Sequence, residues 1–135
     1  MTVVVDASAI VAALIGGGAD GAWAESELAR DDLAAPHLMP AEVANILRRA
    51  ALANRVTVDA ASLAHADLLA LPVALFPYEP LADRSWELRL NMSAYDAWYV
   101  ALAESLDAAM VTLDRRIARA PGPRCAFRTP APTSR

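Results

Sequence analysis

The four residues that follow Met1, Thr2 to Val5, are all β-branched. Such a run is typical of a strand that is buried on both faces, as strands of a parallel sheet are. Asp6 and Ser8 follow, and apolar residues then recur every three or four positions until three consecutive glycines at 16–18. This spacing predicts a helix that ends at glycine. The chain therefore begins with a strand–helix unit, which favours folds built on a parallel sheet.

The same alternation continues along the chain. Beyond the first unit, we expect helices over 20–30, 40–53, 59–71, 81–90, 95–106 and 115–119, and strands over 33–35, 73–76, 109–113 and 125–128. This order predicts an α/β fold, a three-layer α/β/α sandwich with a mostly parallel central sheet. We expect one domain over residues 1–128 and a mobile tail, rich in proline, threonine and serine, over 129–135.

Composition limits the possible functions. The formal charge is -4 and all 12 basic residues are arginine, so we expect no extended basic surface for nucleic acid, and any polynucleotide contact must be local. The single Cys125 excludes an intrachain disulfide and a thiolate metal cage, which fits a reducing compartment, the cytoplasm. No uncharged apolar stretch reaches the ~18 residues of a membrane span, so we expect no membrane association.

Four acidic residues lie in or beside the most apolar segments of the chain: Asp6, Glu42, Asp96 and Asp114. Asp6 and Asp114 each follow a predicted strand, at the edge where open α/β sheets bind ligands. Glu42 and Asp96 lie on the inward edges of predicted helices, because apolar residues follow one turn later. If the fold gathers these carboxylates, they would repel one another unless a cation held them. Carboxylates are hard oxygen ligands suited to Mg²⁺ or Mn²⁺, which indicates phosphodiester or phosphoryl chemistry.

Each of these acids also has a structural interpretation. Asp6 and Asp114 could cap the helices that follow them, and Glu42 could simply complement a helix dipole. Asp96 stands in a helix that is apolar nearly all round, so a purely solvated role is disfavoured there. Taken one at a time, the four positions therefore remain candidates.

Taken in order, these residues resemble the PIN-domain nucleases, specifically the VapC-type toxins of bacterial type II toxin–antitoxin pairs. The resemblance spans nearly the whole chain and rests on the segments VVVDASAIVAAL, PAEVANILRRA and YDAWYVALAESLDAAMVTLD. It implies an endoribonuclease that depends on Mg²⁺ or Mn²⁺ and cleaves RNA. It also implies a cognate antitoxin whose tail covers the acidic pocket, together with a homodimer and toxin–antitoxin hetero-oligomers.

By position in these segments, the resemblance implies four catalytic, metal-binding acids: Asp6, Glu42, Asp96 and Asp114. Ser8 and Thr112 would be polar neighbours that orient water or a carboxylate, and Asn45 would support the acid one turn before it. Some relatives carry a further acid after the last aspartate, where this chain has Arg115 and Arg116. We take these two arginines as candidate contacts to RNA phosphates, and the number of metal ions stays open.

Two other functions remain open at this stage. One is another Mg²⁺-dependent α/β phosphoryl-transfer protein, either a haloacid-dehalogenase-like phosphatase or a response-regulator receiver, in which an aspartate after a strand accepts phosphate. Both normally use a lysine, which this chain lacks, and Ser8 stands where the phosphatase has a second aspartate. The other is a non-catalytic module whose acids bind a cationic partner.

Overall fold

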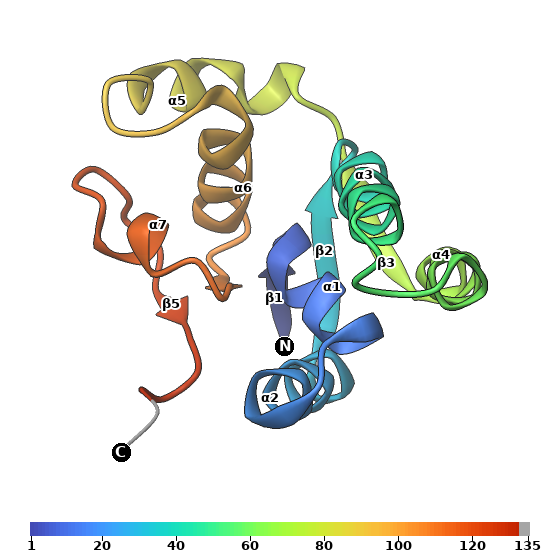
Figure 1. Cartoon of the computed structure of the whole chain (residues 1–135). Helices are drawn as coiled ribbons and strands as arrows, with labels where there is room; N and C mark the ends of the chain where they lie inside the picture. The colour runs from blue at the N-terminus through green and yellow to red at the C-terminus, as the bar shows by residue number, and fades with distance from the viewer. Residues whose placement is uncertain (133–135) are drawn as a thin grey trace.

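Figure 1 shows the computed structural model, which describes residues 1–132 of the chain. Five parallel strands form one sheet in the order β3-β2-β1-β4-β5. The strands are β1 (Thr2–Val5), β2 (Asp32–Pro36), β3 (Val73–Phe76), β4 (Ala109–Val111) and β5 (Phe127–Arg128). The predicted parallel α/β sheet is therefore confirmed.

Two layers of helices enclose this sheet. The helices are α1 (Ala7–Ile15), α2 (Gly18–Arg30), α3 (Met39–Leu52), α4 (Val58–Ala70), the 3-10 helix η1 (Glu79–Leu81), α5 (Ala82–Glu87), α6 (Ala94–Ser105) and α7 (Arg115–Arg119). Helices α1 to α4 contact one another, whereas η1, α5 and α6 form a separate group in which α6 packs on β1, β2 and β4. In Figure 1, α5, α6 and α7 lie on one side of the sheet and α3 and α4 on the other. The arrangement is an α/β/α sandwich.

None of the helices within residues 1–132 is by itself long and apolar enough to cross a membrane. Only α1 and α2 together pass such a test, and they are bent by 112° relative to each other.

The core is densest where β1, β4 and α6 meet. Val3, Val4 and Val5 of β1 are fully buried, as the β-branched run predicts for a central strand. Helix α6 is buried on nearly every side, because residues 97 and 99–103 all lie in the core. A helix enclosed in this way holds its side chains in fixed positions, which matters for Asp96 in its first turn.

Most predicted boundaries agree with the structure to within two residues, but three elements are shorter than expected. The predicted helix over 81–90 ends at Glu87, because Ser93 caps α6 and the chain must leave the helical conformation before it. The predicted strand over 109–113 ends at Val111, since the Leu113 N–H donates to the Ser8 hydroxyl at 3.0 Å and not to another strand. The last strand begins at Phe127, two residues later than expected.

Part of the predicted tail lies against the domain. Pro130 is buried, and its carbonyl accepts a hydrogen bond from Arg115 Nη2 at 2.7 Å. Residues 133–135 lie outside the described residues. The mobility expected for 129–135 stays a prediction.

One ion-pair network fixes α5 against α6 and against the turn at 121–124. Arg84 donates from Nε and Nη2 to the two carboxylate oxygens of Glu104, at 2.6 and 3.1 Å. The same Nη2 donates to the Gly122 carbonyl at 2.8 Å, and the Arg124 N–H donates to Glu104 at 2.8 Å. Arg84 and Glu104 are both largely buried, so their two-pronged pairing is of the stronger kind. It joins α5 to the C-terminal part of α6 and to the turn at 121–124.

Replacing Arg84 by alanine should therefore destabilise the protein by about 2 kcal/mol, because Glu104 would be left largely buried without its cation. The matched control is Glu87→Ala. Glu87 also pairs with Arg84, at 3.0 Å, but its side chain is 60% exposed, so its loss should cost less than about 0.5 kcal/mol. Urea unfolding measures both values. Equal effects of the two substitutions would contradict this description of the network.

Candidate active site

The carboxyl ends of two neighbouring strands bring Asp6 close to Asp114. Strands β1 and β4 pair with Val5 opposite Val111, and the Asp6 N–H donates to the Val111 carbonyl at 3.2 Å. The strand order reverses between β1 and β4, since β2 lies on the other side of β1. In open α/β sheets the ligand crevice lies at such a reversal, beyond the carboxyl ends of the strands.

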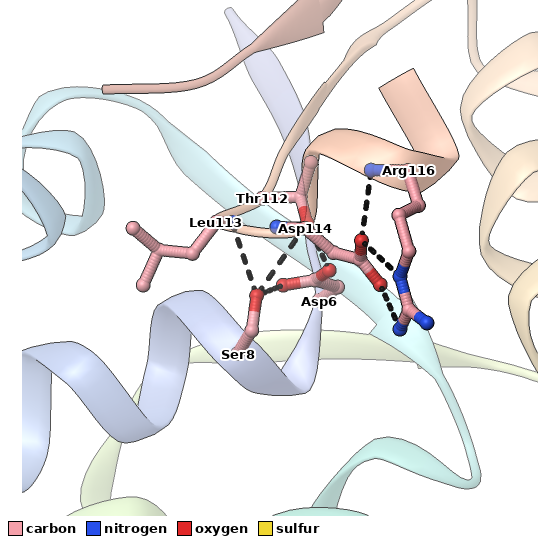
Figure 2. A network of polar contacts seen from close by, with 6 residues as sticks. All are labelled: Asp6, Ser8, Thr112, Leu113, Asp114 and Arg116. Atoms are coloured by element: carbon pink, nitrogen blue, oxygen red, sulfur yellow. Dashed lines mark hydrogen bonds and ion pairs between the residues drawn. The ribbon is translucent and has the colours of Figure 1, made fainter. Parts of the chain in front are cut away.

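Asp6 is held by neutral hydrogen-bond donors from both strand ends (Figure 2). Its Oδ1 accepts from the Ser8 hydroxyl at 2.6 Å and from the Ala9 N–H at 3.1 Å, so Asp6 caps α1. Its Oδ2 accepts from the hydroxyl of Thr112, 106 residues away in the chain. The capping interpretation and the site interpretation of Asp6 are therefore compatible, because one carboxylate caps a helix and also joins two strand ends.

The segment after β4 continues this network. The Leu113 N–H donates to the Ser8 hydroxyl, and the Asp114 N–H donates to the Thr112 hydroxyl at 2.9 Å. The Asp114 carboxylate caps α7 by accepting from the Arg116 N–H at 2.9 Å, and the Arg116 guanidinium lies 3.3 and 3.4 Å from its two oxygens. The Arg116 side chain is 92% exposed, so this ion pair lies at the surface.

Glu42 and Asp96 come from the first turns of α3 and α6. The Tyr99 hydroxyl donates to Glu42 Oε1 at 2.7 Å, and Ser93 caps α6 by accepting from the Asp96 N–H at 3.1 Å. Tyr99 was not predicted from the sequence as a partner of Glu42. Its position three residues after Asp96, on the same helix face, was the available signal.

These carboxylates lie within electrostatic range of one another. Burial raises the pKa of Asp6, Glu42 and Asp96. Repulsion from Asp114 adds to the rise in the pKa of Asp6 and of Asp96, while Asp96 and Asp6 add to that of Glu42. Burial also acts to raise the pKa of Asp114, but hydrogen bonds and charge from Arg116 hold it below its usual value. Three of the four acids are thus costly to keep ionised.

A cavity of about 280 Å³ opens beside this group of acids. Its lining combines two of the carboxylates with an arginine and small or apolar side chains, namely Asp96, Asp114, Arg116, Asn91, Met92, Ile117 and Ala120. A larger cavity of about 520 Å³ lies between the end of α6 and β5, near Cys125, at the amino end of β4. The smaller cavity is the relevant one, because it alone of these two lies at the carboxyl edge of the sheet.

The PIN domain family model matches residues 3–123. The chain belongs to the PIN-domain family. Ribonuclease VapC1 of Mycobacterium tuberculosis (strain ATCC 25618 / H37Rv) is 44% identical over 126 residues, which cover 90% of this chain and 92% of that protein. Within the PIN-domain family, this chain is thus of the VapC ribonuclease type, as its sequence motifs indicate.

Solved structures agree with this assignment. The crystal structure of PAE2754 from Pyrobaculum aerophilum matches with a TM-score of 0.69 and 27% identity, over 94% of this chain and 83% of that one. VapBC2 from Rickettsia felis, bound to a DNA fragment from its promoter, matches with a TM-score of 0.67 over 97% of this chain and 100% of that one. Its identity of 13% indicates a shared fold only. The PIN-domain match and the 44% identity to a ribonuclease support an endoribonuclease over the phosphatase, the receiver and the non-catalytic module.

The PIN-domain fold does not gather all of the predicted residues. Asn45 is exposed on α3, and no hydrogen bond joins it to Glu42 among the described residues, so its support of that acid stays a prediction. Arg115 turns its guanidinium to the Pro130 carbonyl and holds the C-terminal segment. Arg116 lines the acidic cavity and is the better placed of the two arginines for a phosphate.

The acids of this PIN domain fit a hard divalent cation by their chemistry, although not by their present arrangement. Among residues 1–132, no three acidic, histidine or cysteine side chains are arranged as ligands of one ion. Asp6 is turned to hydroxyls, Glu42 to Tyr99 and Asp114 to Arg116. The donors are nevertheless all carboxylates, which are hard oxygen ligands, and a cation would relieve the repulsion that raises three of their pKa values.

The metal-free protein should become more stable as the pH falls towards about 4, the usual pKa of an unfolded carboxyl group. Asp6, Glu42 and Asp96 have a higher pKa when folded than when unfolded, so the folded state takes up protons first. Near the unfolded value of about 4 this gain is complete, and below it Asp114, whose pKa is lowered, is protonated and stability is lost. Thermal melting in chelator at a series of pH values measures the trend.

Asp6→Asn tests the most deeply buried of these three acids, because Asp6 is only 6% exposed. The variant should be more stable than the parent by about 1 kcal/mol at pH 8, since it removes a buried charge while its amide oxygen still accepts from Ala9. The difference should shrink as the pH falls. A variant that is less stable at every pH would contradict the pKa shift assigned to Asp6.

Proposed function

We propose that this protein is the endoribonuclease toxin of a toxin–antitoxin pair, and that it hydrolyses RNA phosphodiester bonds with a divalent cation, Mg²⁺ or Mn²⁺. One observation carries the proposal. Carboxylates from four separate elements interact around one edge of the sheet: Asp114 adds to the rise in the pKa of Asp6 and Asp96, and these two add to that of Glu42. Arg116 is the cation paired with Asp114. The similarity to proteins named ribonuclease supports RNA as the substrate.

The ligands would be the four acids Asp6, Glu42, Asp96 and Asp114. A bound divalent cation would lower the pKa of a coordinated water and neutralise charge on the scissile phosphate. Ser8 and Thr112 hold the Asp6 carboxylate at the ends of β1 and β4. Asp96 lines the cavity from the first turn of α6, in a helix that the core keeps rigid.

Two other groups of the pocket would act on water and on phosphate. Glu42, while helping to hold the cation, would also orient the attacking water. Arg116 would leave Asp114 for a non-bridging phosphate oxygen of the RNA. Since Arg116 is exposed, this exchange would require only side-chain rotation.

We propose a cognate antitoxin as the protein partner. The chain carries a formal charge of -4, and its acidic cavity is suited to a cationic segment of such a partner. The fold shared with VapBC2 from Rickettsia felis supports this view. A homodimer, toxin–antitoxin hetero-oligomers and a cytoplasmic location belong to the same proposal.

Asp96→Asn tests the catalytic assignment. It is nearly isosteric and removes one ligand charge, so RNA cleavage in Mg²⁺ should fall at least about 100-fold, and chelator should abolish cleavage by the parent. The matched control is Asp59→Asn, the same change in the first turn of α4, which should retain full activity. Cleavage of end-labelled RNA under single-turnover conditions measures the rates.

Asp6→Asn should lose activity in the same assay. If Asp6→Asn and Asp96→Asn both cleave RNA as fast as the parent, or if the parent remains active in chelator, the metal-dependent mechanism is refuted.

A further inference from the structure

Tyr99 combines a buried ring with a hydroxyl directed at the acidic group. The residue is only 2% exposed, and its ring belongs to the hydrophobic core around α6. Its hydroxyl donates to Glu42 Oε1 at 2.7 Å, across 57 positions of the chain. A phenylalanine would fill the same space without bringing a polar group into the core. Burying a hydroxyl costs free energy unless a hydrogen bond offsets that cost, and here the hydrogen bond to Glu42 does so.

The contact joins the two helical layers that lie on opposite sides of the sheet. Glu42 comes from α3, in the layer with α1, α2 and α4, whereas Tyr99 comes from α6, in the opposite layer. Asp96 lies three residues before Tyr99, one turn earlier on α6. A single rigid helix thus carries one acid of the pocket and fixes a second acid that comes from the other layer.

The partners of the acids differ in charge. Asp114 is paired with a guanidinium, which cancels its negative charge. Glu42 and Asp6 are instead held by hydroxyls, from Tyr99 in one case and from Ser8 and Thr112 in the other. Hydroxyl donors fix a carboxylate without cancelling its charge. The pocket therefore keeps a net negative charge that is able to attract a cation.

The Tyr99 hydroxyl is the hydrogen-bond donor in its contact with Glu42. Burial, and then the hydrogen bond to Glu42 and its charge, raise the pKa of Tyr99 well above its usual value. The pKa of Glu42 is raised by burial and by the charges of Asp96 and Asp6, and the Tyr99 hydrogen bond partly offsets that rise. Without this donor, Glu42 would be free to turn away from the other carboxylates and into solvent.

We propose that Tyr99 is a positioning residue that fixes Glu42 at the pocket and thereby strengthens the binding of a divalent cation. The inference rests on the proposed function, because it needs the acids to bind such a cation. It assigns to Tyr99 no contact with RNA or with the ion.

The test is the binding of Mn²⁺ to the metal-free, full-length protein in the absence of RNA, measured by isothermal titration calorimetry. Tyr99→Phe should weaken binding by about 10- to 100-fold, as is usual for partners that orient a metal ligand. The matched control is Tyr95→Phe, which removes a hydroxyl from the same helix at a position 60% exposed, and should bind Mn²⁺ as the parent does.

A double-mutant cycle separates positioning from a general loss of structure. If Tyr99 acts through Glu42, then adding Tyr99→Phe to Glu42→Gln should cause no further loss of Mn²⁺ affinity. An equal loss in both backgrounds would overturn the proposal, as would parental affinity in Tyr99→Phe.

If Tyr99→Phe does not fold, Glu42→Asp tests the same contact, because it keeps the charge but withdraws the carboxylate from the hydroxyl. Parental affinity in that variant would overturn the proposal.

Failure of the proposed function and failure of the role of Tyr99 give different results. If the parent protein neither binds Mn²⁺ nor cleaves RNA, the proposed function is wrong and the role of Tyr99 is overturned with it. If the parent does both and Tyr99→Phe equals it in Mn²⁺ affinity, only the role of Tyr99 is wrong.

Discussion

The buried negative charge of Asp6 is the constraint on which the rest of this site depends. Its carboxylate lies at the carboxyl end of the central strand β1, where water is largely excluded, so each of its two oxygens needs a donor. Ser8 supplies one from α1, and Thr112 supplies another from the end of β4. Because these donors come from both strands, satisfying one charge also aligns the two strand ends from which Asp6 and Asp114 emerge.

The carboxylates around the pocket are stabilised in two different ways. Asp6 and Glu42 keep their charge and are held by hydroxyls, whereas Asp114 is neutralised by an exposed guanidinium. The first way preserves a field that attracts cations, and the second leaves a movable positive group beside the cavity. A pocket built this way suits a reaction that brings a divalent cation and a phosphate together.

Much of the fold could be predicted from the sequence, because strand and helix signals are local. The β-branched run at 2–5 and the proline and glycine signals gave most boundaries to within two residues. The family assignment rested on several short segments taken together in their order along the chain. The errors lie where contacts between distant segments decide where an element ends. Leu113 is an example: its N–H donates to the Ser8 hydroxyl, and the strand ends before it.

The sequence by itself indicated the parallel α/β architecture and the family, and it singled out the four acids proposed as ligands, since these follow from hydrophobic periodicity and from the order of motifs. Only the tertiary structure decided which side chains hold those acids. It brings Tyr99 to Glu42, leaves Asn45 exposed and turns Arg115 to the C-terminal segment. The physical reason is that a hydrogen bond between residues 57 or 106 positions apart depends on how the layers pack, and packing has no local signature in the chain.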